Sequence, residues 1–297
     1  MDSGYIGRFA PSPTGPLHFG SLLAALASYL EARAAGGQWL VRMEDLDPPR
    51  EVRGAAEAIL RTLAAYGFEW DGPVRYQSQR AAAYQEAIDR LRRAGLAYDC
   101  GCTRKEIRAA AEAAGGAVYP GTCRAGLPPG KAPRSVRVRT VEECLAFADA
   151  VQGRSEQVLA REVGDFVVRR ADGLFAYQLA VVVDDARQGI THVVRGSDLL
   201  ASTPRQIYLQ RGLEVPTPHY LHIPVASSPA GLKLSKQSQA PALPDADPVP
   251  QLVRALAFLG QPLPSAAERV SLAAFWAWAL AHWDAARIPA VMDRPAP

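Results

Sequence analysis

The sequence has few cysteines, four in 297 residues, and it has no long hydrophobic run. The cysteines are too few and too unevenly spaced for a disulfide framework, so we expect a cytoplasmic protein in a reducing environment. The apolar run at residues 271–280 is far shorter than the ~20 residues that a membrane-spanning helix needs. Residues 1–9 also lack the charged and then apolar pattern of a signal peptide. We therefore expect no membrane partner.

The composition is that of a globular protein with a small excess of basic residues. Hydrophobic residues make up 48% of the chain and charged residues 21%, and the formal net charge is +3. A chain of this length has room for one large or two modest domains with a sizeable core. The small basic excess permits RNA binding through local patches but does not require it.

Residues 8–21, Arg-Phe-Ala-Pro-Ser-Pro-Thr-Gly-Pro-Leu-His-Phe-Gly-Ser, form the first stretch that indicates chemistry. They lie between an expected strand at 5–9 and an expected helix at 21–35, whose leucines recur at helical spacing. Helix N-termini bind anions because their first backbone N–H groups are unpaired and the helix dipole is positive there. His18 and Gly20 would let a phosphate approach closely. The alternative is a tight turn in which His18 only caps the helix.

A second motif, Lys-Leu-Ser-Lys-Gln at residues 233–237, is a candidate phosphate-binding loop. Its two lysines, Lys233 and Lys236, follow Gly231 closely. Such a loop can close on a polyphosphate and neutralise the charge that develops as pyrophosphate leaves. Lysine-rich surface loops are common, so this motif alone is unspecific.

Polar side chains follow the ends of two other expected strands. Glu44 follows the strand at 38–43, and Arg195 follows the apolar strand at 190–194, with Asp198 shortly after it. In open α/β sheets, ligands bind beyond the carboxyl ends of the strands. At that edge Glu44 suits an ammonium group, Arg195 a carboxylate and Asp198 a nucleotide ribose. Each residue also has a structural alternative. Glu44 could lie in a solvated acidic loop, Arg195 could form a surface ion pair, and Asp198 could be a helix N-cap.

The two motifs, taken together, resemble the paired signatures of class I aminoacyl-tRNA synthetases, and residues 8–15 are similar to the glutamyl branch. Ser21, Leu234 and Gln237 depart from the commoner residues, whereas His18, Gly20 and both lysines are kept. The resemblance implies an α/β fold with a Rossmann-type parallel sheet, a small zinc-binding insertion and a short helical C-terminal region. We expect the two halves of the catalytic domain at 1–98 and 135–240, the insertion at 99–134 and the C-terminal region at 241–297.

The expected insertion contains three cysteines with the spacing of a structural zinc site: Cys100, Cys102 and Cys123. From chemistry alone the fourth ligand could be Cys144, Tyr119 or a water molecule. The resemblance points to Tyr119. The alternative is three reduced thiols in a loop-rich segment, with Cys144 on an amphipathic helix at 141–150.

Hydrophobic periodicity and turn residues predict the remaining elements. We expect helices at 53–66, 79–94, 103–114, 199–211, 249–259 and 272–286, an exposed strand at 135–139, a hairpin at 165–177 and a strand at 219–225. A further helix is expected to carry Tyr177 in its first turn.

About sixty residues follow the lysine motif, too few for the anticodon-binding region of a full glutamyl-tRNA synthetase. The sequence is therefore similar to the glutamyl-Q tRNA(Asp) synthetase family. This resemblance implies a monomer that activates L-glutamate with ATP and Mg²⁺ without tRNA, and then transfers it to queuosine in the anticodon stem-loop of tRNA(Asp). It also implies three sets of residues: Arg8, Ser12, Glu44, Tyr177 and Arg195 for glutamate; His18, Gly20, Ser21, Asp198 and Lys236 for ATP; and His18, Lys233 and Lys236 for catalysis.

Three other functions stay open on the sequence alone. A shortened glutamyl-tRNA synthetase would charge tRNA(Glu). A nucleotidyltransferase with the same histidine and lysine signatures would need neither Glu44, Tyr177 nor Arg195. A catalytically inactive RNA-binding relative would be expected to have lost His18 or Lys236, and the sequence keeps both.

Overall fold

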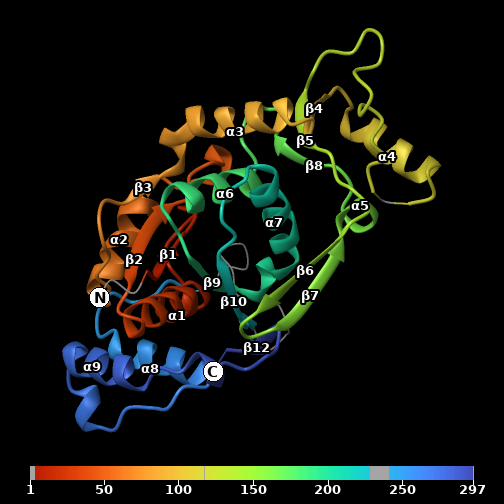
Figure 1. Cartoon of the computed structure of the whole chain (residues 1–297). Coiled ribbons are helices and arrows are strands. Elements are labelled where there is room, and N and C mark those ends of the chain that lie inside the picture. Colours follow the sequence, from red (N-terminus) through yellow and green to blue (C-terminus); the bar gives the residue numbers. More distant parts are fainter. Residues whose placement is uncertain (1–3, 117, 228–240, 297) are drawn as a thin grey trace.

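The structure is a computed structural model that describes residues 4–116, 118–227 and 241–296 (Figure 1). The second motif, with Lys233 and Lys236, lies outside the described residues. Among the described residues, no helix combines the length and the apolar composition needed to cross a membrane.

A parallel sheet forms the centre of the fold. Strands β1 (Ile6–Phe9), β2 (Gln38–Met43) and β3 (Arg75–Tyr76) pair in parallel in the order β1-β2-β3. A second sheet has the order β7-β6-β10-β9, in which β10 is parallel to both β9 and β6. The two sheets meet at β1 and β9, where the backbone N–H of Thr191 donates to the carbonyl oxygen of Ile6 at 3.0 Å. This arrangement confirms the expected Rossmann-type fold.

The other elements have the following bounds. The remaining strands are β4 (Ala97–Cys100), β5 (Ser135–Val138), β6 (Cys144–Asp149), β7 (Gly153–Val158), β8 (Phe166–Arg169), β9 (His192–Gly196), β10 (His219–Ile223), β11 (Val225–Ser227) and β12 (Asp293–Pro295). The α-helices are α1 (Phe19–Ala34), α2 (Ala55–Ala65), α3 (Ala81–Arg93), α4 (Arg104–Ala113), α5 (Leu159–Glu162), α6 (Tyr177–Arg187), α7 (Thr203–Gly212), α8 (Val249–Phe258) and α9 (Leu272–His282).

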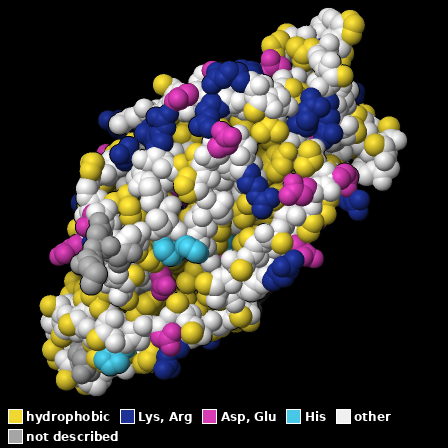
Figure 2. Space-filling model, viewed as in Figure 1, with side chains coloured by type: hydrophobic (Ala, Val, Ile, Leu, Met, Phe, Trp, Pro, Cys, Tyr) yellow, Lys and Arg dark blue, Asp and Glu magenta, His cyan; other side chains and the backbone are white. Residues whose placement is uncertain are grey.

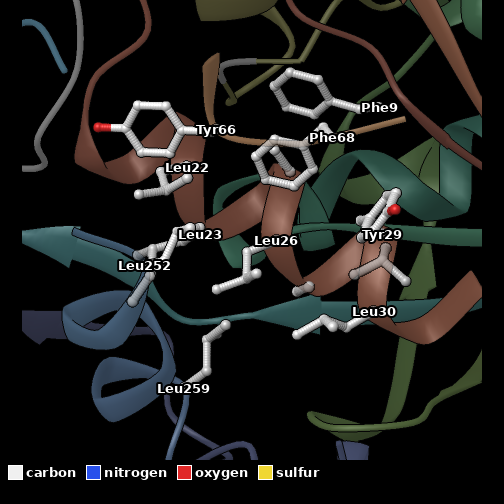
Figure 3. Packing of buried hydrophobic residues seen from close by; sticks show 14 of the residues in the cluster. Phe9, Leu22, Leu23, Leu26, Tyr29, Leu30, Tyr66, Phe68, Leu252 and Leu259 are labelled. Carbon is white, nitrogen blue, oxygen red and sulfur yellow. The ribbon is translucent and has the colours of Figure 1, made fainter. Parts of the chain in front are cut away.

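Helix α1 is deeply buried and fixes the first motif in place. Its leucines Leu22, Leu23, Leu26 and Leu30 are at most 1% exposed and pack between the sheet and α8. Figure 3 shows these side chains beside Leu252 of α8, with Tyr29 and Phe68 in the same core. Burial of each leucine contributes about 1.5–3 kcal/mol, so the N-terminus of α1 is held firmly at the carboxyl edge of β1.

A smaller antiparallel sheet, β4-β5-β8, carries the cysteine segment and projects with α4 from one end of the molecule (Figure 1). Helix α4 begins after Thr103, whose side chain accepts from the backbone of Glu106 while Glu106 bonds back to Thr103. The strand expected at 135–139 is present as β5, but the expectation that it is exposed was wrong. Strand β5 is the central strand of this sheet, and its residues Val136 and Val138 are at most 4% exposed.

The largest error in the expected elements concerns residues 141–150, which contain strand β6 (Cys144–Asp149) where an amphipathic helix was expected. Leu145 and Asp149 are buried and Cys144 is exposed, and β6 pairs along its whole length with the antiparallel β7. Strand β7 is polar and was not expected as a strand. The expected hairpin at 165–177 has its turn at Gly173 (φ 87°), and its return arm forms an isolated antiparallel bridge, Phe175 with Arg169, rather than a full strand. Backbone hydrogen bonds from Arg170 to Leu174 and from Ala176 to Val168 flank this bridge.

Candidate active site

A cavity of about 530 Å³ lies beyond the carboxyl ends of β1, β2 and β9. Its walls include all five residues that the sequence analysis assigned to glutamate: Arg8, Ser12, Glu44, Tyr177 and Arg195. Arg8 lies on β1, Glu44 directly follows β2, Tyr177 begins α6 and Arg195 lies on β9. The fold thus brings together residues from four separate elements, as the rule for strand ends in open α/β sheets predicts.

Arg8 and Glu44, which line the cavity, belong to a buried network of ion pairs around Asp185. This carboxylate accepts from Arg8 Nε at 3.2 Å and from Arg42 Nη1 at 2.8 Å. Arg42 also donates through Nη2 to Glu44 Oε1 at 3.2 Å. Burial acts to raise the pKa of Asp185, but the guanidinium groups of Arg8 and Arg42 outweigh it and lower the pKa below its usual value. Asp185 therefore stays ionised and orients both arginines.

Glu44 has the opposite balance of burial and charge. Its side chain is 9% exposed, and burial raises its pKa although Arg42 and Arg8 oppose the shift. It therefore takes up a proton at a less acidic pH than an ordinary glutamate does. When ionised, this buried carboxylate facing the cavity suits an ammonium group of a ligand.

Arg195, which also lines the cavity, is held in a buried chain of hydrogen bonds. Its Nε donates to His222 Nε2 at 2.9 Å, and Nη2 donates to the hydroxyl of Thr203 at 2.8 Å. His222 Nδ1 lies 2.5 Å from Asp149 Oδ2. Because Nε2 accepts from Arg195, the ring proton is on Nδ1 and is donated to Asp149. Arg195 Nη1 lies 3.5 Å from the hydroxyl of Tyr177, at the cavity.

His222 is neutral in this arrangement. Burial lowers its pKa below the ordinary 6.5, and the nearby charge of Arg195 adds to this effect, whereas Asp149 opposes it. The pKa of Asp149 is also lowered, because hydrogen bonds from His222 and the backbone outweigh the effect of its burial. The hydrogen bonds therefore connect an ionised carboxylate, a neutral imidazole and a guanidinium, in the order Asp149, His222, Arg195.

His18 caps helix α1, as in the alternative to phosphate binding that the sequence left open. Its Nδ1 accepts from the backbone N–H of Ser21 at 3.3 Å, and α1 starts at the next residue, Phe19. A neutral ring that accepts at Nδ1 carries its proton on Nε2, so capping leaves His18 with a donor on the other side of the ring. Gly20 and Ser21 form the first turn of α1, whose Ala24 lines the cavity.

The structure does not bring every expected ATP residue into the cavity wall. His18, Gly20, Ser21 and Asp198 lie beside the lining residues in the described part of the chain rather than among them. Gly196 and Leu199, on either side of Asp198, do line it. The carboxylate of Asp198 lies close over Gly196: a Cβ added at this glycine would be 2.5 Å from Asp198 Oδ1.

Cys100, Cys102 and Cys123 form a cluster in the small sheet, with all three sulfur atoms within 4.8 Å of one another. Cys102 Sγ lies 3.6 Å from Cys123 Sγ, and the hydroxyl oxygen of Tyr119 lies 3.4 Å from Cys100 Sγ and 3.7 Å from Cys102 Sγ. Cys144, on β6, is not part of this cluster. Burial raises the pKa of Cys100, but hydrogen bonds from Tyr119, the backbone and Arg137 outweigh it and lower the pKa to about 7.

Four residues of the cavity networks were missed from the sequence: Arg42, Asp149, Asp185 and His222. A signal existed for two of them. Arg42 interrupts the apolar strand 38–43, and His222 does the same in 219–223, where a charged or polar residue needs a buried partner. Their partners lie far away along the chain, so the sequence alone did not indicate which groups they meet.

Comparison with known proteins places the chain in a family. Residues 6–247 match the family of catalytic domains described as tRNA synthetases class I (E and Q). A glutamate tRNA ligase from Elizabethkingia meningosepticum, solved in complex with its amino acid, superimposes with a TM-score of 0.81 at 26% identity over 97% of this chain. The chain spans 66% of that ligase. It therefore belongs to the class I glutamyl and glutaminyl tRNA synthetase family.

Curated relatives of similar length define the branch. The glutamyl-Q tRNA(Asp) synthetase from Dechloromonas aromatica is 62% identical over 97% of both chains. The enzyme of that name from Thiobacillus denitrificans is 57% identical over 98% of both chains. The enzyme of that name from Pseudomonas aeruginosa is 55% identical over 99% of both chains. Within the class I synthetases, the chain belongs to the glutamyl-Q tRNA(Asp) synthetases.

Proposed function

We propose that this protein activates L-glutamate with ATP in the absence of RNA and then transfers the glutamyl group to queuosine in the anticodon of tRNA(Asp). The observation that carries this proposal is one cavity lined by the carboxylate of Glu44 and by the guanidinium groups of Arg8 and Arg195. The names of the full-length relatives support the same substrate and RNA. We also propose that the protein acts as a monomer.

The charges of the cavity match those of glutamate. The substrate carries one ammonium group and two carboxylates, and the cavity offers a buried carboxylate at Glu44 and two buried arginines, Arg8 and Arg195. Charge-assisted hydrogen bonds of this kind are the stronger class, and arginine suits a carboxylate because its donors form a planar fork. Glutamine has the same shape but a neutral side chain, so a buried arginine facing it would lose its ionic partner.

In the first step, an oxygen of the glutamate α-carboxylate attacks the α-phosphorus of ATP. A P–O bond forms, the bond to the bridging oxygen breaks, and pyrophosphate leaves with that electron pair. The N-terminus of α1 and the Nε2 proton of His18 would bind phosphate oxygens, and Lys236, helped by Lys233, would stabilise the departing charge. Mg²⁺ is expected to enter with ATP and to neutralise part of the phosphate charge.

In the second step, a hydroxyl of the cyclopentenediol of queuosine attacks the carbonyl carbon of glutamyl-adenylate. An ester bond forms and AMP leaves. The leaving phosphate itself can take the hydroxyl proton, since the described part of the cavity wall presents no histidine. The modified base must be turned out of the anticodon loop to reach the cavity, a mode typical of RNA recognition.

We further propose that Cys100, Cys102, Cys123 and Tyr119 hold a structural zinc ion. Typical Zn–S and Zn–O bond lengths in a tetrahedron place two sulfurs ~3.8 Å apart and a sulfur and an oxygen ~3.5 Å apart. The observed separations of 3.6 Å, 3.4 Å and 3.7 Å fit this geometry. The ion would tie the end of β4 to the loop around Cys123 and so stiffen the small sheet.

The experiment that tests the proposal compares substrates. Purified protein is assayed for ATP–pyrophosphate exchange with glutamate, glutamine or aspartate and no RNA, and then for transfer to tRNA(Asp) with and without queuosine. Charging of tRNA(Glu) would favour the shortened glutamyl-tRNA synthetase, and exchange that does not depend on glutamate would favour a nucleotidyltransferase.

A further inference from the structure

A second, smaller cavity of about 290 Å³ is lined by residues of α3, of strands β4, β5 and β8 and of the turn after β8, and it carries an excess of positive charge. Its lining includes four arginines, Arg92, Arg134, Arg169 and Arg170, and one carboxylate, Asp99. Figure 2 shows Lys and Arg side chains gathered over α3 and the adjoining small sheet in the same region. A concave surface with charge of one sign concentrates ions of the opposite sign.

The carboxylates near this cavity pair with only two of its four arginines. Arg92 pairs with Asp99 at 2.5 Å and with Asp89 at 3.4 Å, and Arg170 pairs with Asp172 at 2.6 Å. Arg169 donates to the neutral side-chain oxygen of Gln85 at 3.1 Å and to the backbone, and its guanidinium lies against the ring of Phe175.

Arg134 adds a second uncompensated cation. Its backbone N–H donates to Cys100 O at 3.0 Å, which fixes the start of β5. Its side chain is exposed, and within the described residues it has no hydrogen-bond or ion-pair partner. Arg134 and Arg169 therefore offer, in one hollow, two guanidinium groups that no described carboxylate pairs with.

Arg170 connects this hollow to the candidate active site, because it lines both cavities. It also contacts Asp47 of the active-site wall, with Arg170 Nη1 at 3.5 Å from Asp47 Oδ1. A ligand in the second cavity therefore adjoins whatever occupies the first. Glutamate and ATP are small enough for the larger cavity, so a polyanion that extends out of it is the ligand that fits both.

We propose that the cavity formed by Arg92, Arg134, Arg169 and Arg170 binds backbone phosphates of the RNA strand next to the nucleotide that enters the active site. This inference rests on the proposed transfer to tRNA(Asp) and deepens it by naming where the strand runs. Phosphate contacts fix the position of a nucleic acid but carry no sequence information. The cavity thus positions the strand, while the active site selects the modified base.

Arg134 provides the sharpest test because its side chain supports no other described group. A labelled anticodon stem-loop of tRNA(Asp) is titrated with wild-type protein, Arg134→Ala and Arg134→Lys at salt concentrations from about 50 to 200 mM. One lost phosphate contact should flatten the slope of log Kd against log salt by about 0.7–0.9 and weaken binding about five- to eightfold at 0.1 M salt. Arg134→Lys should keep the slope, because lysine still offers a point charge to phosphate.

The matched control is Arg154→Ala on β7. Arg154 has a side chain that is 75% exposed, pairs with Glu156 and lines neither cavity. This variant should bind RNA as the wild type does, with the same slope. Equal slopes for wild type and Arg134→Ala would overturn the proposal, and so would a loss for Arg134→Ala that Arg154→Ala reproduces.

Two further results distinguish a phosphate site from a site that reads the modified base and from a site for a protein partner. Arg134→Ala should weaken the binding of stem-loops with and without queuosine by the same factor. A loss of affinity confined to the modified RNA would reject a phosphate site. An acidic peptide that displaces the RNA in wild type but not in Arg134→Ala would assign the cavity to a protein partner instead. Failure of wild-type protein to show RNA-free exchange would reject the proposed activation, whereas the salt slope alone decides the phosphate site.

Discussion

Arg195 donates through Nε to His222 Nε2 at 2.9 Å, inside the protein and away from the cavity that Arg195 lines. The neutral imidazole is in turn fixed by Asp149, so the guanidinium is held from behind in one orientation. An arginine that is already oriented before the ligand arrives loses less entropy on binding a carboxylate. We infer that His222 is a positioning residue for glutamate binding.

Replacing His222 tests this role. His222→Leu removes the acceptor for Arg195 and should raise the KM for glutamate by about 10- to 150-fold, the value of one hydrogen bond to a charged group. The KM for ATP should change little. His222→Gln, whose side-chain oxygen can occupy the position of Nε2, should recover much of the loss. Steady-state exchange assays measure the KM for glutamate and the KM for ATP of both variants and of the wild type. Equal KM values for glutamate in the leucine and glutamine variants would argue against positioning through Nε2.

The pH dependence of glutamate binding follows from two groups. Burial raises the pKa of Glu44, so Glu44 becomes protonated and loses its attraction for ammonium at a higher pH than usual. Burial lowers the pKa of His222, which keeps its Nε2 an acceptor until the pH falls below the ordinary 6.5. The charged groups that face His222 are Asp149, Arg195 and Arg8. The pKa of Asp149 is lowered, so this carboxylate stays ionised across the range, and burial raises the pKa of Tyr220, whose ring stacks on His222, so the phenol stays neutral.

Both protonations act in the same direction, so the KM for glutamate should rise as the pH is lowered from 7 towards 5, whereas a flat profile would contradict the account. In Glu44→Gln the KM should be high throughout, and the part of the profile due to Glu44 should be lost. Glu57→Gln, on the exposed face of α2, should keep the wild-type profile.

The proposed zinc site predicts about one zinc ion per chain by elemental analysis. Cys123→Ser should remove the metal and lower the melting temperature, because metal binding contributes to folding. Tyr119→Phe should retain zinc on three thiolates but release it faster to a chelator. Cys144→Ser changes an exposed thiol outside the cluster and should match wild type in both measurements. Wild-type protein that binds no zinc, or equal losses in the Cys123 and Cys144 variants, would contradict the assignment.

Lys236 lies outside the described residues, and its role is therefore tested by kinetics. Lys236→Ala should slow glutamate activation by about 10²–10³-fold, the usual cost of losing one donor to developing charge. The KM for glutamate should stay within about twofold, because the lysine is expected to act on pyrophosphate. Lys105→Ala, on the exposed surface of α4, provides the control. A wild-type exchange rate for Lys236→Ala would reject the proposed role.

Much of the fold followed from local signals in the sequence. Apolar strands that end in a charged residue identified the positions of Glu44 and Arg195, because strand ends of a parallel sheet share one edge. The leucine spacing of α1 is equally local, and it predicted that helix to within two residues at its start and one at its end.

The errors arise where structure depends on distant partners. Five of the six residues of β6, Cys-Leu-Ala-Phe-Ala-Asp, are apolar, so the segment shows neither a two-residue nor a helical period. Its partner β7 is polar, and only the pairing between the two strands decides the structure. Arg42 and Asp185 are 143 residues apart in the chain, and no local pattern indicates their contact. Buried charges within apolar strands are the signal that could have pointed to such networks.

The most direct test of the account is ATP–pyrophosphate exchange by the purified protein with no RNA present. The account predicts exchange that requires glutamate and is not supported by glutamine, followed by a tRNA(Asp) product whose mass increases only when queuosine is present. Exchange that appears only after tRNA is added, or a glutamyl product found on tRNA(Glu), would contradict it.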